Sequence, residues 1–459
     1  MRYQEAALGG PSQGLFFRQR GAGMAESKGP DRPRATTAQG IARALLWLAC
    51  LFLLGGAAVP MPRLFDLRLD TLAGQHGFDV VRWELEAAPS KAWDTLFPPD
   101  RGLSPAEAKA RVLAYWERVQ EVDRVRGALE RLYAEHGQEG PPEDQVQRLR
   151  EDLARLEALQ SQERPLVEAI LAHQVESALW DLGLTTLGRV WPPVAFRLTT
   201  SPLHLTVSPC TVIRVQAARD LRPELPLDLQ VALEERIDRT LNVSSLIEAT
   251  GGYGAYPSMV LETPDLPWVL ETVAHEWTHN YLVFRPLGWR YFDSPEMRSI
   301  NETVADIVGE EVGKAVLVRV YPELAPPPPP PQEKGKTSEP PAFDFAREMR
   351  ATRMEVDRLL AEGKVEEAEA YMEARRQEFV RHGYFLRKLN QAYFAFHGTY
   401  ATGPAASAVD PVGHGLTQLR ARVGSLREFL TLVEGLRSYE DFQRLMQERG
   451  IPLPTPPGP

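Results

Sequence analysis

Cysteine is nearly absent from this chain. Only Cys50 and Cys210 occur among the 459 residues. Because Cys50 sits inside a strongly apolar run, a bridge to Cys210 is implausible, and a disulfide framework is excluded. A zinc site built from cysteine thiolates is equally disfavoured. Any bound metal must therefore be held by carboxylates and by some of the 9 histidines.

Positive charge is also scarce. Asp and Glu number 62 against 52 Lys and Arg, which gives a formal net charge of -10 at pH 7. General nucleic-acid binding needs a basic surface, so we expect no nucleic-acid partner. Hydrophobic residues make up 43% of the chain, enough for a sizeable core. The length suggests two or three domains.

Long hydrophobic runs are limited to one, at 44–62, which carries no charge. As a helix it would be roughly 28 Å long, close to the hydrocarbon thickness of a bilayer. Lys28, Arg32, Arg34 and Arg43 precede it, and the positive-inside rule then places the N-terminus in the cytoplasm. We expect a single-pass anchor in the cell membrane with the rest of the chain outside. The competing interpretation is a cleaved signal peptide, which would make the protein secreted.

Helical patterns begin at Ser104, where Ser, Pro and then Glu107 form a helix start signal. A second helical run covers about 143–182, after a Gly-Pro-Pro break. The two runs predict a long antiparallel hairpin of coiled-coil type, which we interpret as a packing or spacer element.

Later segments alternate between the sequence patterns of strands and of helices. Short runs rich in Val, Thr and Pro predict two strands within 190–216 and another strand at 256–262, with a helix at 226–240 between them. The remaining predicted helices follow a Pro-rich stretch and lie at about 342–380, 384–398, 413–423 and 425–449. The expected fold class is α+β, mostly α, with a small sheet.

These patterns divide the chain into seven parts. We expect a cytoplasmic tail at 1–43, the anchor at 44–62, a connecting segment at 63–103, the helical hairpin at 104–185, a metal-binding domain at 186–324, a Pro-rich loop or linker at 325–341, and a C-terminal helical part at 342–459 that closes the cleft.

The first chemical motif is H-E-x-x-H at 275–279. On a helix, His275 and His279 lie one turn apart on the same face, so both imidazoles can reach one zinc ion. Glu276 lies beside them and can hold a water molecule as general base. By itself the motif only suggests a zinc site, because the same pattern also arises by chance.

The second motif supplies what the first lacks. A site with two histidines needs a third ligand, and Glu302 can provide a carboxylate from a return helix. Asp306 follows one helical turn later, on the same face. It can accept a hydrogen bond from the free ring N–H of a ligand histidine, most readily His275, which fixes the tautomer of that ligand.

Together, H-E-W-T-H at 275–279 and N-E-T-V-A-D at 301–306 resemble the gluzincin metallopeptidases, of which thermolysin is the best-known example. The resemblance covers roughly 60 residues and implies a zincin-like domain with one Zn²⁺. It assigns His275, His279 and Glu302 as metal ligands and Glu276 as general base. It also implies that the strand at 256–262 is the edge strand that binds the substrate backbone.

Two further residues are implied by the same resemblance. Thermolysin-like enzymes stabilise the developing oxyanion with a Tyr between the two motifs and a His well downstream. Tyr291 is the candidate tyrosine, and His397 is the candidate histidine, with His414 as an alternative. An aromatic core with an incidental His explains each downstream histidine equally well.

The expected function is hydrolysis of peptide or protein substrates by a zinc metallopeptidase at the extracytoplasmic face of a membrane. The alternative is a catalytically silent metal-binding scaffold or adaptor that acts through the hairpin. A G-x-M-E-N motif, which aminopeptidases of this clan usually carry, is missing before the helix. Its absence slightly favours an endopeptidase or a specialised enzyme, and the choice between endopeptidase and aminopeptidase stays open. The helix at 268–284 is too short and polar for an intramembrane protease.

Overall fold

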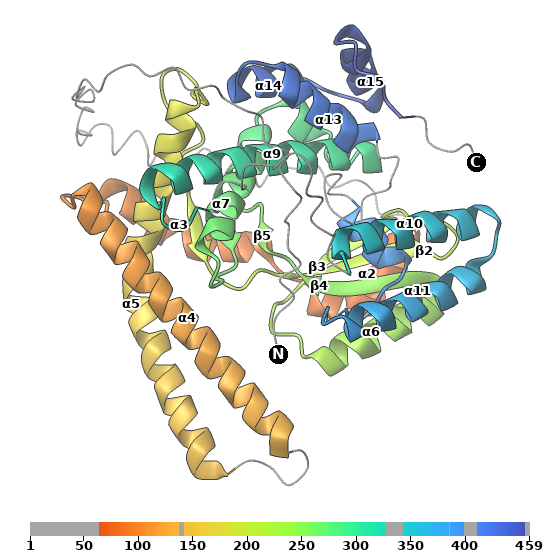
Figure 1. Ribbon diagram of the computed structural model, residues 1–459, viewed down its shortest axis with the longest axis horizontal. Coiled ribbons are helices and arrows are strands. Elements are labelled where there is room, and N and C mark those ends of the chain that lie inside the picture. Colours follow the sequence, from red (N-terminus) through yellow and green to blue (C-terminus); the bar gives the residue numbers. More distant parts are fainter. Residues whose placement is uncertain (1–63, 137–141, 326–342, 385, 399–410, 455–459) are drawn as a thin grey trace, which may run out of the picture.

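The computed structural model describes residues 64–136, 142–325, 343–384, 386–398 and 411–454. Helices predominate and two small sheets accompany them, which confirms the expected mostly helical α+β class (Figure 1). The expected anchor at 44–62 lies outside the described residues. Among the helices that are described, none is long and apolar enough to cross a bilayer. The anchor therefore stays a prediction.

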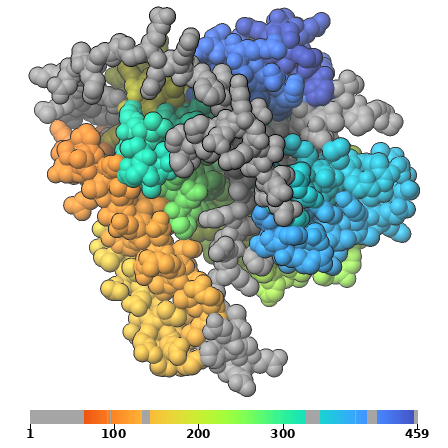
Figure 2. Space-filling view, in the orientation of Figure 1, coloured from red at the N-terminus to blue at the C-terminus, as the bar shows by residue number. Residues whose placement is uncertain are grey.

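The predicted hairpin is formed by α4 (Pro105–His136) and α5 (Glu143–Asp181). The two helices pack side by side and project from the rest of the molecule (Figures 1 and 2). Ser104 begins α4 as expected: its Oγ accepts from the N–H of Glu107 at 3.2 Å, and the Glu107 carboxylate accepts from the N–H of Ser104 at 2.8 Å. This reciprocal pair satisfies two backbone donors at the helix start.

The base of the hairpin is tied to the segment that precedes α7 (Leu266–Leu282). The indole of Trp116 donates to the carbonyl of Thr263 at 3.1 Å, and the Tyr115 hydroxyl donates to Glu262. Arg164 of α5 pairs with the same carboxylate at 3.1 Å. Both hairpin helices therefore hold the start of α7.

The larger sheet has the order β3-β2-β4 and is antiparallel. Successive side chains of a strand point to opposite faces of the sheet, and on one face apolar residues such as Leu205 pack against α2 and α6. Leu246 faces the opposite side, where it joins the core formed by α10, α11 and α12. The bounds of these elements are β2 (Leu203–Pro209), β3 (Ala217–Leu221), β4 (Val243–Ala249), α2 (Leu64–Ala73), α6 (Leu227–Leu241), α10 (Phe345–Ala361), α11 (Val365–Arg381) and α12 (Gln391–His397).

The smaller sheet has the order β1-β6-β5 and lies beside α7. The main core joins α7 and the hairpin to α9 and the C-terminal helices α13, α14 and α15. The bounds of the elements not yet given are η1 (Gly74–His76), α3 (Val80–Leu96), β1 (Phe196–Leu198), β5 (Gly252–Tyr253), β6 (Ser258–Val260), α8 (Pro286–Trp289), α9 (Pro295–Val320), α13 (Pro411–Arg422), α14 (Leu426–Val433) and α15 (Tyr439–Glu448).

Several predicted boundaries were wrong. The helix expected at 342–380 is two helices, because Gly363 adopts a φ of 74° and ends α10. That left-handed conformation favours glycine. The helix expected at 425–449 is likewise two, α14 and α15, and the one expected at 384–398 shrinks to α12. Strands β3, β4 and β5 were missed.

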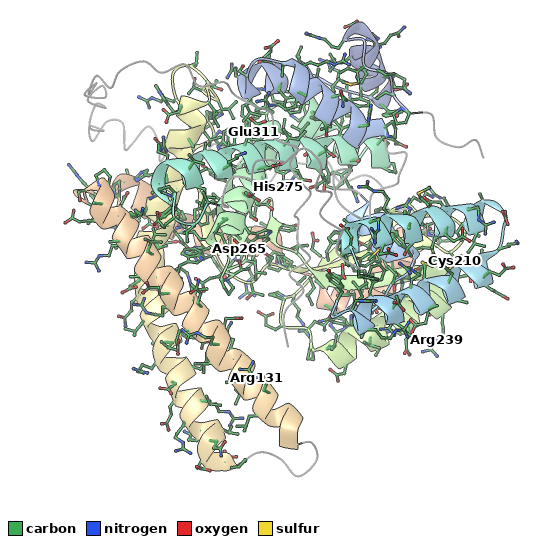
Figure 3. The ribbon with its side chains drawn as sticks, in the orientation of Figure 1. Arg131, Cys210, Arg239, Asp265, His275 and Glu311 are labelled. Carbon is green, nitrogen blue, oxygen red and sulfur yellow. The ribbon has the colours of Figure 1, made fainter. Side chains whose placement is uncertain are left out.

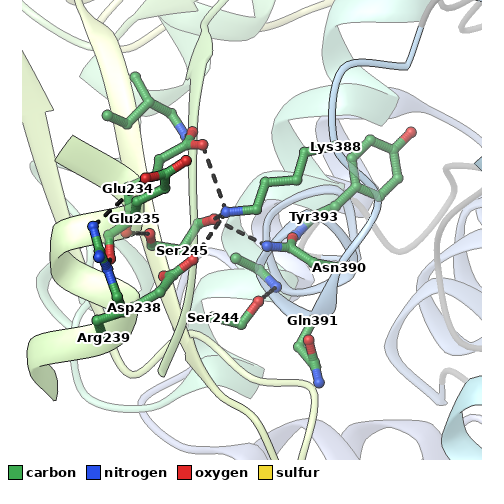
Figure 4. Close-up of polar contacts among 12 residues, drawn as sticks. Glu234, Glu235, Asp238, Arg239, Ser244, Ser245, Lys388, Asn390, Gln391 and Tyr393 are labelled. Atoms are coloured by element: carbon green, nitrogen blue, oxygen red, sulfur yellow. Dashed lines mark hydrogen bonds and ion pairs between the residues drawn. The ribbon is translucent and has the colours of Figure 1, made fainter. Parts of the chain in front are cut away.

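The outer edge of β4 is covered by charged and polar side chains (Figure 4). Glu234 of α6, only 2% exposed, accepts from the N–H of Ile247 at 2.6 Å and from Arg387 at 2.8 and 2.6 Å. Lys388 and Asn390 donate to the carbonyl of Ser245 at 2.8 and 2.9 Å. The strand edge is thus closed to pairing with another strand.

We expect Glu234→Gln to lower the free energy of unfolding by about 2–4 kcal/mol, because it leaves the Arg387 charge without its carboxylate. Urea titration would measure the loss. Glu235→Gln is the matched control, since Glu235 is exposed and lies 3.6 Å from Arg239. That change should cost less than about 0.5 kcal/mol. Equal stability of the two variants would contradict the role given to Glu234.

Candidate metal centre

Two helix starts place the site. Asp265 caps α7, with its carboxylate accepting from the N–H of Trp268 at 3.1 Å. Ser294 caps α9, with its hydroxyl accepting from the N–H of Met297 at 3.2 Å, and Pro295 follows. Each cap satisfies backbone donors at the first turn and fixes where the helical periodicity begins. The spacing of the site residues within each helix follows from these starts.

The two helices cross at very short range because α9 has glycines where it meets α7. A Cβ added to Gly309 would lie 2.8 Å from the carbonyl oxygen of Glu271 and 3.2 Å from the Cβ of His275. A Cβ on Gly313 would lie 2.6 Å from the Cγ of Glu271. No side chain fits between the backbones at these two positions. The crossing therefore brings the second motif onto the first.

Three predicted ligands, His275, His279 and Glu302, converge at this crossing. Figure 3 labels one of them, His275. The Nε2 atoms of His275 and His279 lie 3.0 Å apart, and each lies 3.5 Å from Oε2 of Glu302. A tetrahedral zinc ion with bonds of about 2.0–2.1 Å holds its ligand atoms about 3.3 Å apart. The three side chains could thus hold one metal ion, and within the described residues no fourth His, Cys, Asp or Glu joins them.

Each of the two histidine ligands has a polar partner at its other ring nitrogen, Nδ1. His275 Nδ1 lies 3.0 Å from Asp306, as predicted, and His279 Nδ1 lies 2.9 Å from Oδ1 of Asn301. Such hydrogen bonds fix the tautomer that leaves Nε2 free for a metal. Sequence reasoning gave Asn301 no role. Its position immediately before Glu302 was the one signal that could have found it.

The charges of the ligands depend on one another. Burial opposes ionisation of Glu302, but the charge of His279 and the hydrogen bonds from both histidines lower its pKa well below its usual range. Burial also works against a charged His275, yet Asp306 and Glu302 raise the pKa of that imidazole well above its usual value. The carboxylates therefore favour a positive charge between them, at the point where the three ligand atoms meet.

Glu276 is buried beside the histidines. Its Oε2 accepts no hydrogen bond within the described residues. Burial raises its pKa, and the charges of Glu302 and Asp306 add to the effect against the opposing charges of the histidines. Gly252 allows this placement, because an added Cβ there would lie 2.1 Å from Oε1 of Glu276. An unpaired buried carboxylate oxygen fits a group that holds a water molecule.

The edge strand differs from the one that the resemblance implied. The segment at 256–262 contains β6 (Ser258–Val260), which pairs with β1 on one side and β5 on the other, so it is central. The edge strands are β1 and β5, and β5 was missed because it has only two residues, Gly252 and Tyr253. This strand lies directly against Glu276.

The two predicted oxyanion donors have different surroundings. Tyr291 lies at the site, where its hydroxyl donates to Oε1 of Glu302 at 2.5 Å. His397 lies on α12, where its Nε2 is 2.8 Å from Glu248 and its ring contacts Tyr393 and Phe396. None of these contacts is with the metal-site residues. His414 is exposed on α13.

A second polar group, which sequence reasoning missed, adjoins the site through β5. The Tyr253 hydroxyl donates to Oδ2 of Asp220 at 2.8 Å, and Nδ1 of His204 lies 2.8 Å from Oδ1 of the same residue. The three residues come from three strands. No local pattern could have shown that they meet.

Comparisons with protein-family models, with curated proteins and with solved structures found no match to this chain. A functional assignment must therefore rest on the geometry of its own residues.

Gly309→Ala should weaken zinc binding at least tenfold and lower the unfolding free energy by about 1–3 kcal/mol, because the new Cβ meets backbone that must move. Competition with a chelating dye and thermal unfolding would measure both. Gly435→Ala is the control, since its Cβ would meet nothing within 4 Å. Wild-type zinc affinity in Gly309→Ala would show that the close crossing is not needed.

Glu271, one turn before His275, makes stability depend on pH in the metal-free protein. Burial, with the charges of Glu310, Asp265 and Asp306, raises its pKa to about 7. The folded state then binds a proton that the unfolded state releases near pH 4.5. This group therefore costs stability progressively as pH rises from about 4.5 to 7.

Glu271→Gln should remove this cost and stabilise the metal-free protein at pH 8 by about 1–3 kcal/mol, with little change at pH 4.5. Urea titrations at the two pH values, with a chelator present, would measure the difference. The exposed Glu296 offers a control as Glu296→Gln. A gain of equal size at both pH values would contradict the assignment.

Proposed function

We propose that this protein is a zinc-dependent metallopeptidase with a zincin-like catalytic region. The observation that carries the proposal is the convergence of His275, His279 and Glu302 at ligand spacing, with the unpaired carboxylate oxygen Oε2 of Glu276 beside them. Three protein ligands with an open position are typical of catalytic rather than structural zinc sites.

The residues of the chain divide the chemistry among them. A zinc ion held by the three ligands supplies Lewis acidity toward a carbonyl oxygen and toward water. Glu276 takes the proton of the attacking water and delivers it to the leaving amine nitrogen. Tyr291 donates its single hydroxyl hydrogen to Glu302. To stabilise a developing oxyanion, that hydroxyl would have to turn from Glu302 to the substrate oxygen.

A peptide is the substrate that best suits the surroundings. The edge strand β5 ends its sheet and places Gly252 against Glu276. An extended peptide can add to such an edge through backbone hydrogen bonds, which brings its carbonyl groups past the metal site. An extracytoplasmic location is part of this proposal, but it depends on the apolar run at 44–62 and not on the described residues.

Glu276→Gln tests the proposal directly. The variant should still bind one zinc ion per chain but should lose at least 100-fold in kcat on casein and on a quenched peptide library, because the proton acceptor is gone. Metal content is measured by atomic absorption. Glu296→Gln, which changes an exposed carboxylate of α9, should retain wild-type activity.

Two outcomes would count against it. Unchanged cleavage by Glu276→Gln would remove this residue from the mechanism. A wild-type protein that binds zinc stoichiometrically but cleaves no substrate would favour the scaffold alternative. The projecting hairpin of α4 and α5 would then be the element to test for partner binding (Figure 2).

A further inference from the structure

An arginine stands one helical turn before the metal ligand of α9. Arg298 and Glu302 are four residues apart and therefore share a helix face. The Arg298 guanidinium carbon lies 5.3 Å from the ring centre of Tyr291 and 5.9 Å from that of Phe292. Because Tyr291 donates to Glu302, the guanidinium is one aromatic ring away from the metal site.

The hydrogen-bond donors of this guanidinium have no acceptor within the described residues. Three other half-buried arginines are paired with carboxylates: Arg164 with Glu262, Arg387 with Glu234, and Arg420 with Glu311. A guanidinium that stacks on an aromatic ring uses its face, and its N–H groups still point outward in the plane. Arg298 thus presents donors suited to a carboxylate.

The neighbouring carboxylate of Asp220 does not take up these donors. Both of its oxygens are already engaged, one by His204 and the other by Tyr253, each at 2.8 Å. Burial opposes its ionisation, but the interaction with His204, the Tyr253 hydroxyl and the charge of Arg298 lower its pKa. The charge of Arg298 on α9 therefore acts on Asp220, whose partner Tyr253 belongs to β5.

We propose that Arg298 binds a carboxylate of the peptide substrate close to the scissile bond. The inference rests on the proposed peptidase function and names its substrate class. The carboxylate comes either from an acidic side chain or from the C-terminus of the peptide. With peptide residues spaced about 3.5 Å apart, it lies within one or two residues of the carbonyl under attack.

Matched peptides test this preference with the full-length, zinc-loaded protein. Each quenched peptide is made with Glu or Gln at the positions around the cleavage site, and with a free or an amidated C-terminus. Wild type should cleave the acidic member of a pair with about 10- to 100-fold higher kcat/KM, as expected for hydrogen bonds to a charged group. Arg298→Gln should bring that ratio to about one, and Arg298→Lys should retain part of it.

The two kinds of peptide pair, Glu against Gln and free against amidated C-terminus, distinguish the two sources of the carboxylate. If amidation abolishes the preference, the terminal carboxylate is bound; if Glu-to-Gln exchange abolishes it, the side chain is bound. Arg290→Gln is the matched control, because Arg290 is an exposed arginine nearby that pairs with Asp293 at 3.0 Å. It should keep the wild-type ratio. Equal cleavage of acidic and neutral peptides by wild type, or a preference that survives Arg298→Gln, overturns the proposal.

A binding measurement distinguishes this failure from failure of the proposed function. In the Glu276→Gln background, fluorescence anisotropy should show that the acidic peptide binds about tenfold more tightly than its neutral partner, and that Arg298→Gln removes the difference. Absence of cleavage by wild type together with this Arg298-dependent binding would refute the peptidase alone. Loss of the binding difference would refute the role of Arg298.

Discussion

The close crossing of α7 and α9 is the constraint from which the rest of the site follows. Ligands on two helices can converge on one ion only if the helix axes approach closely, and Gly309 and Gly313 permit this approach. Around the crossing, buried residues of the hairpin, the small sheet and the C-terminal helices form one continuous core. Protein interiors are packed as densely as organic crystals, so this surrounding core holds the two helices in one register.

The same crossing concentrates negative charge. Glu271, Glu276, Glu302 and Asp306 all lie on or beside it, with two histidines as the opposing groups. Burying carboxylates without a cation is costly, which explains why burial raises the pKa of Glu271 and of Glu276 while the histidines lower that of Glu302. A divalent cation at the three ligand atoms would offset this cost. Metal binding would then be linked to the stability of the crossing, because an ion would favour the state in which the three side chains already converge.

How much could be predicted from the sequence depended on the range of each interaction. His275, His279, Glu302 and Asp306 were predictable because helical periodicity sets which residues share a face, and metal chemistry then selects among them. The hairpin was predictable for the same reason. By contrast, β5 is two residues long and exists only through its pairing with β6. The meeting of His204, Asp220 and Tyr253 depends on three strands separated in the chain. The contacts of His397 with Glu248 are of the same long-range kind.

The hairpin and the metal site share one attachment. Glu262 accepts hydrogen bonds from the Tyr115 hydroxyl and the Arg164 guanidinium, and the carbonyl of Thr263 accepts from the Trp116 indole. Thr263 lies two residues before the capping residue Asp265. A shift of the hairpin base must therefore act on the first turn of α7, whose register sets the position of His275 and His279. The opposite end of α7 is held by Tyr281, which donates to Glu434 of the C-terminal helices. Both ends of α7 are thus tied to segments far away in the chain, and such support is what a site with a fixed metal geometry needs.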